Sequence, residues 1–163
     1  MHYLIVDDDD ICRHFLARAL AQYGTSEIAK NGKEAIGLFA KSLSNGQLYD
    51  VIFLDIMMPI MDGRLALTSI RQLEKKAGLL AGWGTKIVMT TALGNYESIQ
   101  SAFRGQCDGY LVKPLKMSRL LALLRNLDVI PRSASSAARR ASLKQATAAD
   151  SDAQQGPGSA ASP

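Results

Sequence analysis

The fold is decided by one stretch of the sequence, Val51-Ile52-Phe53-Leu54-Asp55-Ile56-Met57-Met58-Pro59-Ile60-Met61-Asp62-Gly63. Its first four residues are all apolar, a pattern typical of a short strand buried on both faces. The strand ends at Asp55. The methionines Met57, Met58 and Met61 lie in an apolar loop and are interpreted as packing residues rather than as ligands of a soft metal. The stretch therefore predicts a buried strand that delivers an acid to the edge of a sheet.

Strands and helices alternate outward from this stretch. Apolar strand segments are expected at residues 3–6, 27–30, 51–54, 86–90 and 110–112. Apolar residues at helical spacing predict helices around residues 11–20, 35–39, 65–73, 99–103 and 120–127. Strands buried on both faces and separated by helices predict an α/β fold with a five-stranded, parallel, doubly wound sheet. Ligands of such sheets bind beyond the carboxyl ends of the strands, so functional residues are expected at that edge.

The composition is that of one globular domain with a polar tail. Hydrophobic residues make up 47% and charged residues 21% of the 163 residues, which is enough for a single packed core. Residues 1–130 are predicted to form this domain. Residues 131–163 are dominated by Ala, Ser, Gly and Pro and are predicted to be a disordered tail, because they bury too little apolar surface to offset their ordering entropy.

The sequence also argues against several other classes of protein. No apolar run approaches the roughly 20 residues of a membrane span, and the amino terminus has no signal-peptide pattern, so a cytoplasmic protein is expected. Cys12 and Cys107 have no zinc or disulfide spacing and are expected to be partly buried thiols. The net charge of +4 is not spread evenly along the chain, because the short tail carries +2 and the much longer domain the other +2. This bias is too weak to predict a nucleic-acid partner.

Polar residues follow four of the five predicted strands. These residues are the run Asp7-Asp8-Asp9-Asp10, Asp55, Thr90-Thr91 and Lys113-Pro114. Because the carboxyl ends of parallel strands meet at one edge, these side chains are expected to converge. Crowded carboxylates repel one another, and Mg²⁺ suits them because it takes few protein carboxylates and keeps waters that phosphate oxygens can replace. An aspartate that attacks phosphorus, helped by a metal and a lysine, is the chemistry that this set supports.

These motifs resemble those of receiver domains in two-component signalling, of the chemotaxis-regulator type. The matching segments, in the order of the family, are Leu4-Ile5-Val6-Asp7-Asp8-Asp9, Phe53 to Gly63, Val88-Met89-Thr90-Thr91-Ala92 and Gly109-Tyr110-Leu111-Val112-Lys113-Pro114. The resemblance covers residues 1–130 and implies a flavodoxin-like (βα)5 fold. One departure is the stretch 74–84, which is longer than usual and is interpreted as a surface insertion.

The resemblance implies a role for each matching acid. Asp55 is the expected phosphoacceptor, and Mg²⁺ is the expected cofactor. Asp7 and Asp8 are the expected acidic pair, one binding the metal directly and the other through water. The backbone carbonyl of Met57 is expected to complete the protein ligands, together with Asp55.

Other matching residues are implied to act on the phosphoryl group or to respond to it. Lys113 is expected to pair with the phosphoryl group, and Thr91 is expected to bond one of its oxygens. Tyr110 is the aromatic residue whose rotamer is expected to report the switch. Pro114 is expected to follow Lys113 through a cis peptide bond.

The residues themselves leave some assignments open. Asp9 and Asp10 are expected to cap the first helix, where acids suit the helix dipole, but a run of four aspartates leaves the register of the metal-binding pair open. Thr90 is an alternative to Thr91 as the switch hydroxyl. Tyr110 taken alone would be a core or edge aromatic.

The function that the resemblance implies is that of a response-regulator receiver phosphorylated by a sensor histidine kinase. A downstream protein is expected on the face of the fourth helix, fifth strand and fifth helix, which carries Arg104, Lys116, Arg119 and Arg125 beside Tyr110. One alternative is a phosphorelay intermediate that passes the group to a histidine phosphotransfer protein. Another is the receiver half of a truncated DNA-binding transcription factor. No helix-turn-helix pattern follows residue 130, so neither nucleic acid nor a membrane is expected as a partner of this chain.

No enzyme activity is expected beyond assistance to the chain's own phosphorylation and a slow self-dephosphorylation. Water has to attack phosphorus in line with the bond to Asp55, and polar side chains beside that path can hold it. The resemblance places Met57 and Leu93 beside the path, and neither holds a water well. The aspartyl phosphate is therefore expected to last minutes to hours.

Overall fold

Five parallel strands and four helices make up the described part of this computed structural model, residues 1–79, 84–92 and 106–131. The strands are β1 (His2–Val6), β2 (Thr25–Ala29), β3 (Val51–Asp55), β4 (Lys86–Ala92) and β5 (Gly109–Lys113), in the spatial order β2-β1-β3-β4-β5. The helices are α1 (Asp10–Leu20), α2 (Gly32–Ser44), α3 (Gly63–Lys76) and α5 (Met117–Asn126). The predicted five-stranded, parallel, doubly wound sheet is confirmed. The helix expected around 99–103 lies outside the described residues.

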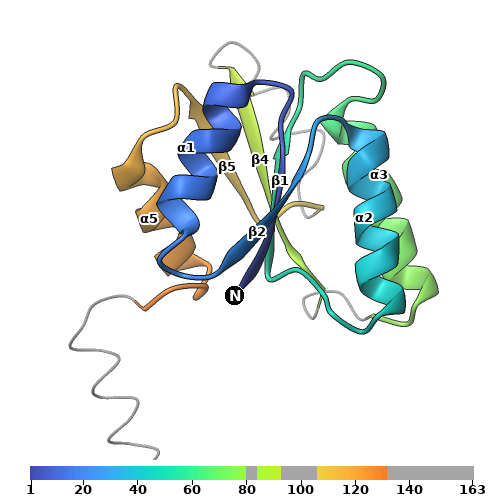
Figure 1. Cartoon of the computed structure of the whole chain (residues 1–163). Helices are drawn as coiled ribbons and strands as arrows, with labels where there is room; N and C mark the ends of the chain where they lie inside the picture. The colour runs from blue at the N-terminus through green and yellow to red at the C-terminus, as the bar shows by residue number, and fades with distance from the viewer. Residues whose placement is uncertain (80–83, 93–105, 132–163) are drawn as a thin grey trace, which may run out of the picture. The chain divides into compact units, whose positions relative to one another are not determined.

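Helices cover both faces of this sheet, with α1 and α5 on one side and α2 and α3 on the other (Figure 1). Successive residues of the central strands point alternately to the two sides. In β3, Phe53 packs in the core beside α1 and α5, whereas Leu54 packs in the core beside α2 and α3. In β4, Val88 and Met89 divide in the same way. We call these two sides the α1/α5 face and the α2/α3 face.

Capping side chains determine where three of the helices begin. Asp9, Asn31 and Asp62 each accept a hydrogen bond from a backbone N–H in the first turn of α1, α2 and α3. Such caps satisfy N–H groups that have no partner within the helix. The expected cap at Asp9 is confirmed, and Asp10 is the first residue of α1.

The first turn of α1 differs from the predicted apolar pattern. Ile11 is the first of the apolar residues at helical spacing that predict this helix, yet it is 79% exposed, whereas Arg13 is only 5% exposed. Ile11 precedes the buried Leu16 by five residues, which places it about 140° away around the helix. Arg13 lies on the buried side, where its Nη1 donates to the carbonyl oxygen of Asp7 at 2.7 Å.

A charged network ties the end of α3 to the starts of β4 and β5. Arg71 Nη1 lies 2.7 Å from Glu74 Oε2, and Arg71 Nη2 lies 2.9 Å from Asp108 Oδ2. Glu74 Oε1 accepts a hydrogen bond from the N–H of Thr85 at 2.8 Å. The network therefore fixes both ends of the predicted insertion, of which residues 80–83 lie outside the described part.

All of these elements belong to one of the two units into which the contacts divide the chain, Met1–Ile130 and Pro131–Pro163. The predicted disorder of the tail falls on residues that the structure does not describe, and it stays a prediction. Cys12 and Cys107 are both half-buried thiols, as expected. Within the described ranges, no helix combines the length and the apolar character needed to cross a membrane.

Gly63, the first residue of α3, lies against the end of β3. A β-carbon at this position would lie 2.0 Å from the carbonyl oxygen of Asp55. We expect Gly63→Ala to lower the free energy of unfolding by at least ~2 kcal/mol, because the loop has to move away. Gly37→Ala is the matched control: Gly37 is an exposed residue of α2 with nothing within 4 Å of the new β-carbon, and the helix should gain up to ~1 kcal/mol. Urea unfolding followed by circular dichroism measures both, and equal effects would contradict the prediction.

Candidate functional site

Two buried acids and a lysine meet at the carboxyl edge of the sheet. Asp7 directly follows β1, Asp55 ends β3 and Lys113 ends β5. Asp7 and Asp55 are 1% and 3% exposed. Lys113 Nζ lies 3.1 Å from Oδ1 and 2.9 Å from Oδ2 of Asp7, and 3.1 Å from Oδ2 of Asp55. The structure therefore brings together three of the residues that the sequence places at this edge.

Asp8 completes an acidic cluster with these two aspartates. One carboxylate oxygen from each of Asp7, Asp8 and Asp55 lies within 4.8 Å of the other two, and Asp8 is exposed. Three acids at this spacing need positive charge, and a hard divalent cation with oxygen ligands supplies it. The set suits Mg²⁺, because the exposed side leaves room for the waters that this ion keeps. Met57 lies in the loop after β3, and the role of its backbone carbonyl as a ligand stays a prediction.

Burial determines the electrostatics of the cluster. Burial, reinforced by the carboxylate of Asp7, raises the pKa of Asp55 to about 6, although Lys113 acts in the opposite direction. Burial alone would lower the pKa of Lys113, but its contacts with Asp7 and Asp55 outweigh this effect, and the pKa is raised. Lys113 is therefore a cation at neutral pH, whereas the charge of Asp55 is only partly compensated.

Arg13 is a residue of this site that the sequence motifs do not indicate. Its Nη1 donates to the carbonyl oxygen of Asp7, and its Nη2 forms an ion pair with Asp10. The N–H of Asp9 donates to Oδ1 of Asp7 at 3.0 Å. Together these contacts fix both the backbone and the carboxylate of Asp7. An arginine three residues after an acid is common on helix surfaces, so the spacing alone gives no sign that this one is buried.

The two threonines near the end of β4 point to opposite sides of the sheet. Strand alternation places Thr90 on the α1/α5 face and Thr91 on the α2/α3 face. Tyr110 packs against the core of the α2/α3 face. The two expected switch residues, Thr91 and Tyr110, thus share a face. In this structure the hydroxyl of Thr91 donates to the carbonyl oxygen of Ala92 at 3.1 Å, and its role in switching stays a prediction.

The segment after β5 carries the remaining predicted features. The Lys113–Pro114 peptide bond is cis, as expected. Lys116 and Arg119 are exposed and Arg125 is half-buried. Arg104, the fourth basic residue expected on the output face, lies outside the described residues.

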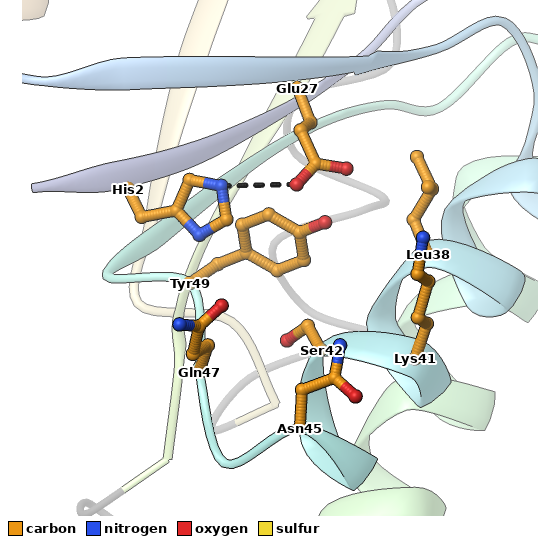
Figure 2. A pocket seen from close by; sticks show the side chains of 8 residues that line it. All are labelled: His2, Glu27, Leu38, Lys41, Ser42, Asn45, Gln47 and Tyr49. Atoms are coloured by element: carbon orange, nitrogen blue, oxygen red, sulfur yellow. Dashed lines mark ion pairs between the residues drawn. The ribbon is translucent and has the colours of Figure 1, made fainter.

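A second polar pocket lies on the α2/α3 face near the start of β1 (Figure 2). It has a volume of about 50 Å³ and is lined by residues of β1, β2, α2 and the segment before β3. His2 Nε2 lies 3.2 Å from Glu27 Oε1, and the rings of His2 and Tyr49 are 4.5 Å apart. Burial, together with the carboxylate of Glu27, raises the pKa of the Tyr49 hydroxyl. These three side chains contact one another, and they hold the start of β1 against β2 and the segment before β3.

Comparison with known proteins places the chain in a family. Residues 3–125 match the family model of the response regulator receiver domain. The chain is 30% identical over 114 residues to the chemotaxis protein CheY of Halobacterium salinarum, a match that covers 69% of this chain and 84% of CheY. It is also 30% identical over 123 residues to the osmosensing histidine protein kinase SLN1 of Saccharomyces cerevisiae, over 74% of this chain but 10% of SLN1. The chain belongs to the response regulator receiver domain family.

Solved structures share the fold. A mutant of the receiver domain of the histidine kinase CKI1 from Arabidopsis thaliana aligns with a TM-score of 0.66 at 28% identity, over 79% of this chain and 90% of that chain. A chain in the co-crystal structure of Ypd1, a histidine phosphotransfer protein of Saccharomyces cerevisiae, with the receiver domain of its response regulator Ssk1 aligns with a TM-score of 0.63 at 28% identity, over 74% and 83%. These likenesses confirm the flavodoxin-like fold.

The raised pKa of Asp55 leads to a prediction about stability and pH. Without metal, the folded chain holds the Asp55 proton more tightly than the unfolded chain, whose aspartates titrate near pH ~3.9. The stability contributed by this group is therefore present below that pH and is lost as the pH rises through about 6. We expect Asp55→Asn to raise the free energy of unfolding by ~1–2 kcal/mol at pH 7 in excess EDTA. The gain should shrink as the pH falls towards 4. Urea unfolding across this pH range tests it, and a gain that does not change with pH would contradict the assignment.

Proposed function

We propose that Asp55 accepts a phosphoryl group from the phosphohistidine of a sensor histidine kinase, with Mg²⁺ bound by Asp7, Asp8 and Asp55. The observation that carries the proposal is the ammonium of Lys113 3.1 Å from the buried carboxylate of Asp55, within a cluster of three acids. A nucleophilic carboxylate, a set of metal ligands and a fixed cation are the parts that phosphoryl transfer requires. In this proposal the domain is not an enzyme in its own right, because its own Asp55 is the acceptor that becomes phosphorylated.

In the proposed transfer, one bond to phosphorus forms and another breaks. A carboxylate oxygen of Asp55 bonds to phosphorus, and the bond between phosphorus and the donor's histidine nitrogen breaks, with the electron pair staying on nitrogen. Lys113 lies beside the oxygens where negative charge accumulates and offsets it, and bound Mg²⁺ supplies further positive charge there. The hydroxyl of Thr91 turns to a phosphoryl oxygen, and Tyr110 on the same face follows.

Apolar side chains around the acids form the surface that a donor has to contact. Ile11, Met57, Ile60 and Leu65 are each between 60% and 79% exposed. They belong to the first turn of α1, the loop after β3 and the first turn of α3, and we call them the apolar rim. A phosphohistidine reaches Asp55 only if its protein covers this rim. We infer that the donor presents an apolar surface around its histidine.

The downstream partner is expected on a different surface. Lys116 and Arg119 are exposed on α5 and the segment before it. Tyr110 stands on β5, the edge strand of the described sheet, and packs on the opposite face from α5. A change of its rotamer would therefore alter the surface at this edge. A protein with an acidic surface would bind one state better than the other.

A second candidate function is favoured by the relatives themselves. SLN1 and CKI1 are histidine kinases, and Ypd1 is a histidine phosphotransfer protein. A receiver that resembles theirs suits a phosphorelay, in which the phosphoryl group of Asp55 passes on to another histidine. Transfer of label from the phosphorylated chain to a histidine phosphotransfer domain would distinguish this function from a terminal switch.

Phosphorylation of the purified chain by acetyl phosphate tests the proposed acceptor. With Mg²⁺ present, we expect intact mass spectrometry to show one added phosphoryl group, and with EDTA none. Asp55→Asn should abolish the addition. Asp50→Asn is the matched control, because Asp50 precedes the opposite end of β3 and contacts the N–H of His2. A phosphoryl group on the Asp55→Asn variant would place the acceptor elsewhere.

The lifetime of the phosphorylated state tests the proposed slow hydrolysis. The side chain of Met57 is 62% exposed beside the acids, and Leu93 lies outside the described residues. We expect wild type to keep its phosphoryl group for minutes to hours in Mg²⁺. The double variant Met57→Asn with Leu93→Glu should lose it about tenfold faster, because polar side chains can position the attacking water. Loss within seconds from wild type, or an unchanged rate in the variant, would refute the argument.

A further inference from the structure

Thr90 carries a buried hydroxyl that has no assigned use. The residue is 1% exposed, and its Oγ1 has no hydrogen-bond partner among the described residues. Buried hydroxyls are nearly always hydrogen-bonded, because an unpaired one destabilises the fold. An orphaned hydroxyl next to a reactive site therefore suggests that its partner arrives in another state of the protein.

The strand order places Thr90 on β4, between Asp55 on β3 and Lys113 on β5. Thr90 is the β4 residue in register with Asp55, and Ala92 is the residue in register with Lys113. Since β4 lies between β3 and β5, Lys113 has to cross β4 to reach the carboxylate of Asp55. Phe53, Val88 and Leu111 all pack in the core of the α1/α5 face. Strand alternation therefore points Asp55, Thr90 and Lys113, each two residues further along, to this same face.

In this structure the ammonium of Lys113 forms ion pairs with the carboxylates of Asp7 and Asp55. It has three N–H donors, and it contacts both carboxylate oxygens of Asp7 and one of Asp55. The same oxygens are needed by a bound cation and by the bond to phosphorus. Once they are taken, a phosphoryl oxygen can accept from one N–H of the ammonium, and its remaining donors need another acceptor.

We propose that Thr90 is a positioning residue for phosphoryl transfer, whose hydroxyl oxygen accepts a hydrogen bond from the Lys113 ammonium in the metal-bound, phosphorylated state. The inference rests on the proposed function of Asp55. It gives the two threonines of β4 separate roles. Thr90 holds Lys113 on the α1/α5 face, and Thr91 turns to a phosphoryl oxygen, which lets Tyr110 move on the α2/α3 face.

Thr90→Val tests this through two effects of opposite sign. In EDTA the variant should melt about 2–6 °C higher than wild type, because it loses an unpaired buried hydroxyl. In Mg²⁺ it should bind beryllofluoride, a mimic of the phosphoryl group, about tenfold more weakly, because Lys113 loses an acceptor. Thermal unfolding in EDTA measures the first effect. Thermal unfolding during a titration with beryllofluoride in Mg²⁺ measures the second on the same protein.

Two further variants separate positioning from simple packing. Thr85 lies just before β4, about 16 Å along the strand from Thr90, and its Oγ1 is also buried without a partner among the described residues. Thr85→Val should raise the melting temperature in the same way but leave beryllofluoride affinity unchanged. Thr90→Ser keeps the hydroxyl and should keep an affinity within about twofold of wild type.

The outcomes distinguish this inference from the proposed function. If wild type binds beryllofluoride and Thr90→Val binds it equally well, Thr90 is not a positioning residue and the function of Asp55 stands. A lower melting temperature of Thr90→Val in EDTA also overturns the inference, because the hydroxyl then has a partner in the resting state. If wild type neither binds beryllofluoride nor takes a phosphoryl group from acetyl phosphate, the proposed function itself fails.

Discussion

Crowded negative charge at one edge of the sheet is the constraint on which the rest of the site depends. Parallel strands that end together leave Asp7 and Asp55 side by side and nearly inaccessible to solvent. Water cannot screen them, so the protein has to supply the positive charge itself. Lys113 reaches both carboxylates from β5, and Arg13 donates a hydrogen bond to the backbone carbonyl of Asp7 from α1. The compensation is incomplete, as the raised pKa of Asp55 shows. A resting site with unbalanced charge responds strongly when a cation or a phosphoryl group changes that balance.

Side chains along a strand point alternately to the two faces of the sheet, so the residues around Asp55 are divided between these faces. Asp55 and Lys113 lie at strand ends on the α1/α5 face, and Thr90 points to the same side. Thr91, one residue later, points to the α2/α3 face, against which Tyr110 packs. The proposed phosphorylation of Asp55 would therefore act on two hydroxyls on opposite sides of one strand. The backbone of β4 is the rigid element between them, since it is hydrogen-bonded to β3 and β5 along its length.

Features encoded by local patterns could be predicted from the sequence, whereas features that depend on tertiary contacts could not. The strands, the convergence of Asp7, Asp55 and Lys113, and the cap at Asp9 follow from short runs of residues whose meaning does not depend on distant partners. The exposure of Ile11 and the burial of Arg13 do not. They depend on which side of α1 meets the sheet and on a carbonyl group that the helix brings within reach. The orphaned hydroxyl of Thr90 is likewise invisible in sequence, because a threonine near a strand end is ordinary until its neighbours are known.

The electrostatics of the cluster also explain why the surface around it is apolar. Ile11, Met57, Ile60 and Leu65 remain exposed although burying them would stabilise the chain. Basic side chains at these positions would compete with a divalent cation for the carboxylates, and acidic ones would add to charge that is already poorly compensated. Apolar side chains avoid both problems and still favour association with a partner, because they gain free energy from burial without adding charge near Asp55. The proposed metal site and the proposed docking surface thus call for the same residue types.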